Sequence, residues 1–94
     1  DAEIVQESYL HVGLVYRKLG KLELSIAALQ KAEELLKQHG VGSSPHYDLA
    51  EIFIEQGRVD EAIETCEKSL RIWSRDPGIK QKLVEAYEIK KRNG

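Results

Sequence analysis

The feature of this 94-residue sequence that most limits its fold is a run of apolar residues spaced alternately four and three positions apart. The run consists of Val5, Tyr9, Val12, Tyr16 and Leu19. This spacing places the five side chains on one side of an α-helix. Gly20 follows directly, where a helix commonly ends in a left-handed residue. The pattern predicts a helix that buries this stripe in the core and ends at Gly20.

A second run of apolar residues begins at Leu22, soon after the first run ends at Leu19. It extends to Leu36 and is followed by Gly40. So short a connection between two helices allows only a tight turn. We therefore expect the first two helices to fold back on each other as a hairpin.

Proline and glycine residues mark the ends of three further helices. Ser44-Pro45 and Asp76-Pro77 each combine a side chain that can cap a helix with a proline suited to its first position. Gly57 separates the third helix from the fourth. Apolar and polar residues do not alternate over any long stretch, so we expect five helices and no β-sheet.

The helices also repeat along the chain, which we tested by aligning the glycines of the turns. When Gly20 is placed on Gly57, Val12 falls on Leu49 and Tyr16 on Phe53. We predict a single domain over residues 1–94, with a first repeat at about 6–40, a second at about 43–75 and a terminal helix at about 77–92.

The residues at these repeated positions resemble the tetratricopeptide repeat family. The first unit has the family's series of large, small and aromatic residues, which here is Tyr9, Val12, Gly13, Tyr16, Gly20, Leu22, Ser25, Leu29 and Ala32. The second unit matches with Leu49, Ala50, Phe53, Gly57, Val59, Ala62, Cys66 and Ser69. The third departs from the pattern, because Lys91 stands where the turn glycine is expected. The small residues are expected where packed helices approach closely.

The resemblance implies an all-α, right-handed α-solenoid of antiparallel helical hairpins that serves as a scaffold for binding other proteins. In that family the first helix of each hairpin lines an inner groove. Transferred position by position, the predicted groove residues are Leu10, Leu14, Arg17, Tyr47, Glu51, Ile54, Glu55, Lys82, Glu85, Glu88 and Ile89. Four of these are carboxylates and two are isoleucines off the core stripes. The predicted guest is a basic peptide or an amphipathic helix.

Two alternatives stay open. The groove residues could be a solvated helix face with two isolated isoleucines, since single exposed apolar residues are common. The chain could instead be a structural segment that forms a homo-oligomer or continues a longer solenoid. For that second alternative, the expected contact residues are Trp73, Ile79 and Ile89, although packing of Trp73 against the fifth helix is the simpler expectation.

Within the same family, some repeats grip the acidic tails of heat-shock chaperones with a clamp of basic and amide side chains. The matching positions here hold Leu10, Leu14, Asp48, Gly78 and Lys82. Because only Lys82 is basic and Asp48 would repel such a tail, we predict no binding of this kind.

Other classes of function find little support. The net charge of −2 argues against a dedicated nucleic-acid binder, and no apolar run is long enough to enter a membrane. The three histidines and Cys66 lack zinc-ligand spacing, so neither a metal nor another cofactor is expected. No residues suggest an enzyme. The chain begins at Asp1 and contains no methionine, which suggests a processed protein or, preferably, a piece of a longer one. Because the sequence shows neither a signal peptide nor a transmembrane segment, a cytoplasmic location is expected.

Overall fold

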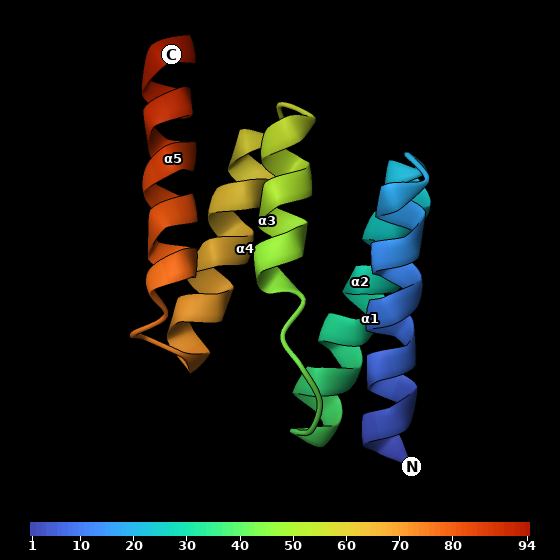
Figure 1. The fold of residues 1–94 in the computed structure, drawn as a ribbon. Coiled ribbons are helices and arrows are strands. Elements are labelled where there is room, and N and C mark those ends of the chain that lie inside the picture. Colours follow the sequence, from blue (N-terminus) through green and yellow to red (C-terminus); the bar gives the residue numbers. More distant parts are fainter. The chain divides into compact units, whose positions relative to one another are not determined.

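The computed structural model describes all 94 residues and contains five α-helices and no strand (Figure 1). The helices are α1 Ala2–Lys18, α2 Leu22–His39, α3 His46–Glu55, α4 Val59–Ile72 and α5 Pro77–Asn93. This confirms the predicted all-α fold with five helices. The chain divides into two compact units, Asp1–Pro45 with α1 and α2, and His46–Gly94 with α3 to α5. That both belong to one domain stays a prediction.

The two helical turns expected from the repeat have the same backbone hydrogen bonds. After α1, the amide of Gly20 donates to the carbonyl of Arg17 at 3.0 Å, and that of Lys21 donates to Tyr16 at 2.9 Å. After α3, Gly57 and Arg58 make the equivalent bonds at 3.0 and 2.8 Å. The glycines have φ of +76° and +73°, the left-handed geometry that ends a helix in this way.

Small residues bring α1 and α2 together in the first unit. A Cβ added to Gly13 would lie 2.7 Å from the side chain of Leu29, so a larger residue there would separate the helices. Ser25 is fully buried, and its Oγ donates to the carbonyl of Gly13 at 2.7 Å. The predicted close approach at Gly13 and Ser25 is therefore confirmed.

The second unit has a compact core in which α3, α4 and α5 meet. Ala50, Cys66 and Ile79 form its buried centre, and Leu70 and Leu83 pack against them. Cys66 is fully buried. Asp76 caps α5 by accepting hydrogen bonds from the amides of Gly78 and Ile79, as predicted.

The stripe predicted to be the core side of α1 is instead largely exposed. Val5, Tyr9, Val12 and Leu19 are between 39% and 63% exposed, and Tyr16 is half-buried. The buried residues of α1 are Gln6 and Gly13, which lie on the side that faces α2. The prediction was wrong because spacing identifies an apolar side of a helix but does not identify what covers it.

A buried glutamine, which the sequence reasoning missed, fixes the segment between α2 and α3. The Gln6 amide nitrogen donates to the carbonyls of Ala32 and Ser43, at 3.1 and 2.7 Å. Its oxygen accepts from the Ser43 amide at 3.0 Å. Gly42 lies against this side chain, with φ of +115° and no room for a Cβ. Gln6 thus satisfies its own polar atoms and ties this segment to α1.

Candidate protein-binding surface

The candidate surface lies on α3 and α5, within the second unit. On α3, Tyr47, Glu51 and Ile54 follow one another at steps of four and three and so share one side of the helix. The core residues Leu49 and Phe53 occupy the opposite side and are almost completely buried. We call the predicted groove residues of these two helices the α3/α5 face. They are Tyr47, Glu51, Ile54, Glu55, Lys82, Glu85, Glu88 and Ile89.

Lys82 lies at the centre of this face and connects its two helices. Its Nζ is 3.5 Å from Oε2 of Glu51 on α3 and 3.4 Å from Oε2 of Glu85 on α5. The same ammonium lies 5.3 Å from the centre of the Tyr47 ring, within range of a cation–π contact. The Lys82 side chain is only 15% exposed, so these partners hold it in place.

The electrostatic setting keeps Lys82 charged. Partial burial acts to lower the pKa of Lys82, but the carboxylates of Glu51 and Glu85 outweigh it and hold that pKa above its ordinary value. The ammonium compensates part of the negative charge of these carboxylates. The α3/α5 face is therefore less acidic at its centre than the sequence suggested.

The remaining predicted groove residues lie around this cluster or in the other unit. Ile54 and Ile89 are half-buried, whereas Glu55 and Glu88 are exposed. Leu10, Leu14 and Arg17 belong to the first unit and are half-buried. Direct contacts thus join four of the predicted residues, namely Tyr47, Glu51, Lys82 and Glu85.

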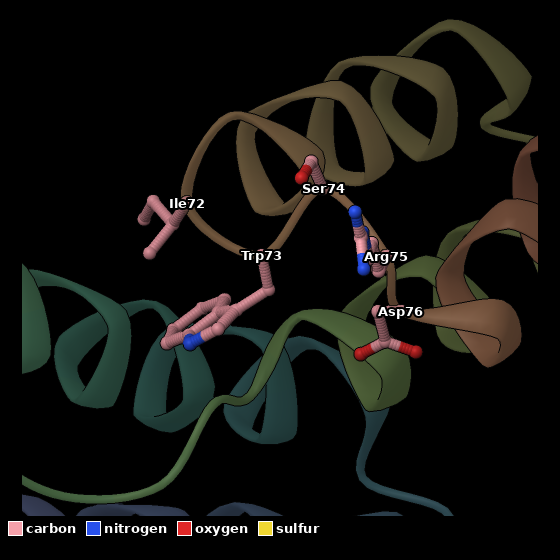
Figure 2. Close-up of a pocket in the computed structure, with 5 residues that line it drawn as sticks. All are labelled: Ile72, Trp73, Ser74, Arg75 and Asp76. Atoms are coloured by element: carbon pink, nitrogen blue, oxygen red, sulfur yellow. The ribbon is translucent and has the colours of Figure 1, made fainter.

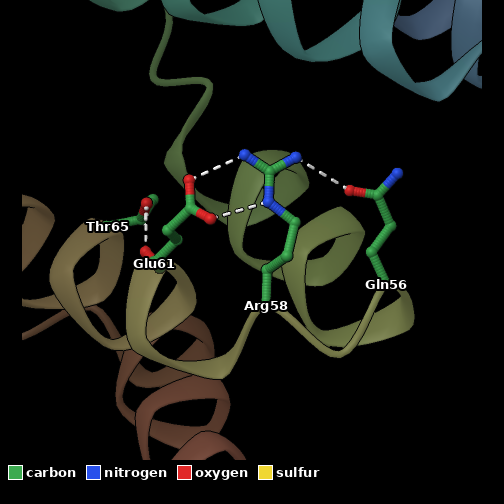
Figure 3. A network of polar contacts seen from close by, with 4 residues as sticks. All are labelled: Gln56, Arg58, Glu61 and Thr65. Carbon is green, nitrogen blue, oxygen red and sulfur yellow. Dashed lines mark hydrogen bonds and ion pairs between the residues drawn. The ribbon is translucent and has the colours of Figure 1, made fainter.

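Arg58, in the turn between α3 and α4, stabilises the hairpin of these two helices. This hairpin includes α3, one of the two helices that form the α3/α5 face. Arg58 donates from Nε and Nη2 to the two carboxylate oxygens of Glu61, both at 2.7 Å, and from Nη1 to Gln56 at 3.1 Å (Figure 3). Its guanidinium also lies 4.8 Å from the centre of the Phe53 ring. The hydrogen bonds from Arg58 lower the pKa of Glu61. The sequence analysis did not identify these contacts of Arg58, although the sequence shows an arginine three residues before a glutamate.

Trp73 occupies a different part of the second unit, at the end of α4. It is 39% exposed, and its ring and the His46 ring form a T-shaped contact with a centroid distance of 6.1 Å. It lines an open depression of about 480 Å³ together with the residues that follow α4 (Figure 2). Packing of Trp73 against the fifth helix stays a prediction, and the sequence analysis did not anticipate this aromatic contact with α3.

The side chains do not assemble a metal site. No group of three histidine, cysteine, aspartate or glutamate side chains lies close enough to hold a metal ion. Burial raises the pKa of the Cys66 thiol to about 11, which disfavours the thiolate needed of a nucleophile. What the side chains of the α3/α5 face offer is charge, hydrogen bonding and apolar contact.

Comparison with known proteins bears directly on this reading. The family model of the tetratricopeptide repeat matches residues 6–39 and 44–72, which together make up most of the chain. No curated protein matches the sequence. None of the five helices combines the length and the apolar character needed to cross a membrane.

Proposed function

This chain belongs to the tetratricopeptide repeat family, and on that basis we propose that it binds a basic, amphipathic segment of another protein on its α3/α5 face. Repeats of this family build helical solenoids, generally mediate protein–protein interactions and are typically non-catalytic scaffolds. The observation that carries the proposal is the position of Lys82. It joins α5 to α3 through its ion pair with Glu51 and its contact with the Tyr47 ring and so holds the two helices as one surface.

The charges of this surface favour a positively charged guest. It carries the carboxylates of Glu51, Glu55, Glu85 and Glu88 and a single ammonium, that of Lys82. Glu55 and Glu88 are exposed, so lysine or arginine side chains of a guest can reach them without displacing Lys82. Complementary charge of this kind increases the association rate and selects the partner.

The apolar residues of the surface favour a guest with an apolar side. Ile54 on α3 and Ile89 on α5 are half-buried, so each has apolar surface left to cover. Tyr47 adds an aromatic ring that is 44% exposed beside Lys82. An amphipathic helix could place its apolar side on these residues and its basic residues against the outer glutamates.

A titration with two synthetic helical peptides tests this proposal. One carries leucine and lysine at helical spacing, and the other has glutamate in place of each lysine. We expect the lysine peptide to bind at least about tenfold more tightly by fluorescence anisotropy, because the glutamate peptide is repelled. The same repulsion accounts for the expected failure to bind the acidic tails of heat-shock chaperones, since Lys82 is already occupied by Glu51 and Glu85.

Charge reversal at the exposed edge of the face provides the matched control. Glu55→Lys combined with Glu88→Lys should weaken the lysine peptide about tenfold. Glu34→Lys combined with Glu64→Lys changes the net charge equally, but these residues lie on α2 and α4 and should leave binding unchanged. Equal losses in the two double variants would mean that binding follows net charge, and the proposed surface would then be wrong. Glu51 and Glu85 are poor choices for reversal because they contact Lys82.

A further inference from the structure

The turn between α4 and α5 exposes two large apolar side chains that follow each other in the sequence. Ile72, the last residue of α4, is 57% exposed, and Trp73 is 39% exposed. Both line the open depression of Figure 2, together with Ser74, Arg75 and Asp76. We call these five residues the α4–α5 turn surface. A depression with an aromatic wall suits an apolar side chain of a binding partner.

Contact with α3 holds the Trp73 ring in place. The ring forms its T-shaped contact with His46, which is only 2% exposed and belongs to the buried side of α3. The indole therefore has its position before a partner arrives. A side chain that is already ordered loses less conformational entropy on binding.

The backbone of this surface is a hydrogen-bonded turn that presents Arg75. The amide of Asp76 donates to the carbonyl of Trp73 at 3.2 Å, which places Ser74 and Arg75 at the two central positions of the turn. Both central residues are exposed. The carboxylate of Asp76 instead accepts from the first amides of α5. The charged group that this surface offers to a partner is therefore the guanidinium of Arg75.

The charge of this part of the chain is opposite to that of the chain as a whole. The ten residues from 71 to 80 include three basic residues, Arg71, Arg75 and Lys80, and one acidic residue, Asp76. The three basic side chains are exposed, and none of them makes an ion pair or a hydrogen bond within the chain. These ten residues carry a net charge of +2, whereas the whole chain carries −2. An area of this kind favours a negatively charged partner.

From the exposed indole and the unpaired cations, we propose that the α4–α5 turn surface binds an acidic segment of a partner protein. One apolar side chain of that segment occupies the depression against Trp73, and its carboxylates pair with Arg75 and Arg71. A guanidinium binds a carboxylate through two parallel hydrogen bonds, which favours arginine in this role. A contact this small is weak, and we expect a dissociation constant of about 1 mM.

This surface is separate from the α3/α5 face. The two surfaces favour guests of opposite charge, and neither proposal depends on the other. The proposed contact also differs from the self-association considered from sequence, because Ile79, one of the residues expected there, is only 1% exposed.

Trp73 reports directly on binding, because it is the only tryptophan of the chain. The probe is the peptide Asp-Glu-Leu-Asp-Glu with both ends blocked, which is too short to form a stable helix. At constant ionic strength, titration to about 5 mM should shift the Trp73 emission to shorter wavelength and approach saturation. The same peptide with glycine in place of leucine should bind at least about fivefold more weakly, because the depression then stays unfilled.

Charge reversal at the turn has a matched control at the other end of α5. Arg75→Glu should weaken the acidic peptide at least about tenfold. Lys91→Glu makes the same change of charge at another exposed side chain without an ion pair, and it should leave binding unchanged. Circular dichroism should show that both variants keep the helical content of the parent chain. Glu55→Lys combined with Glu88→Lys should not weaken this peptide, which separates the outcome from that of the α3/α5 face.

Four outcomes would overturn the proposal. The Trp73 emission could stay unchanged at the highest peptide concentration, or Arg75→Glu and Lys91→Glu could weaken binding equally, as a response to net charge alone would do. The glycine peptide could bind as well as the leucine peptide, in which case the depression takes no part. The emission could also shift without any peptide, either as the protein concentration rises or with vesicles that contain about one-third phosphatidylserine. A second copy of the chain or a membrane surface would then cover Trp73 instead.

Discussion

Two buried serines have opposite hydrogen-bonding situations. Ser25 Oγ donates to the carbonyl of Gly13 at 2.7 Å, whereas the buried Oγ of Ser69 has no hydrogen-bond partner. Ser25→Ala should lower the free energy of unfolding by about 1–2 kcal/mol, because the hydrogen bond is lost and the carbonyl of Gly13 loses that donor. Ser69→Ala should leave stability unchanged or raise it by up to about 1 kcal/mol, since it removes an unsatisfied polar atom.

Urea denaturation of the parent chain and the two variants measures this difference. The substitution is chemically the same at both sites, so each variant is the control for the other. A loss of stability in Ser69→Ala equal to that in Ser25→Ala would contradict the assigned hydrogen bonding.

Because the thiol of Cys66 is buried, we expect the stability of the folded chain to fall at alkaline pH. Burial raises its pKa from the ordinary value of 9.0 to about 11, an effect that the nearby ammonium of Lys82 only partly opposes. Between these values the unfolded chain releases the thiol proton while the folded chain keeps it. Stability is therefore complete below pH 9 and falls as pH rises toward about 11, by at most about 1.4 kcal/mol per pH unit.

Comparison with Cys66→Ala isolates this contribution from the titration of tyrosine and lysine. Urea denaturation is measured for both chains from pH 7 to pH 11. The free-energy difference between them should be constant up to about pH 9 and then shrink as the parent chain loses stability. A difference that stays constant to pH 11 would show that Cys66 ionises equally well in the folded chain.

At the scale of single helices, the hydrogen bonds of Asp76 indicate how much the N-terminal cap of α5 contributes to stability. Its carboxylate accepts from the amides of Gly78 and Ile79, at 3.0 and 3.2 Å. Asp76→Ala should lower the free energy of unfolding by about 1 kcal/mol, since these amides lose their acceptor. Asp76→Asn keeps a side-chain oxygen in place and should cost much less. Thermal denaturation followed by circular dichroism compares the three chains, and equal losses for alanine and asparagine would argue against capping.

The helices themselves were largely predictable because their signals are local. Gly20 and Gly57 supplied the left-handed turns, and Asp76-Pro77 supplied a cap and a first helical residue. The start of α3 differs by one residue, since the helix begins at His46 and Pro45 precedes it. Small differences at helix ends are common because the terminal residues lack a full set of hydrogen bonds.

Contacts that depend on tertiary packing were harder to predict. Spacing showed that α1 has an apolar side, but whether another surface covers that side is not encoded in the spacing. Lys82 was identified as a groove residue, yet its contact with Glu51 depends on how α3 and α5 meet.

At the scale of the whole molecule, the size of the two units predicts how the chain unfolds. Asp1–Pro45 and His46–Gly94 each contain about half of the residues. Units this small rarely bury enough apolar surface to be stable alone. We therefore expect the chain to unfold in one cooperative transition, as a single domain would.

Trp73 makes this prediction testable because it is the only tryptophan and lies in the second unit. Its fluorescence reports on that unit, whereas circular dichroism reports on the helices of both. The two urea transitions should coincide, and Ser25→Ala, which lies in the first unit, should lower both midpoints equally. Since Ser25 is on α2, an unchanged Trp73 transition in that variant would mean that the second unit is stable without the first.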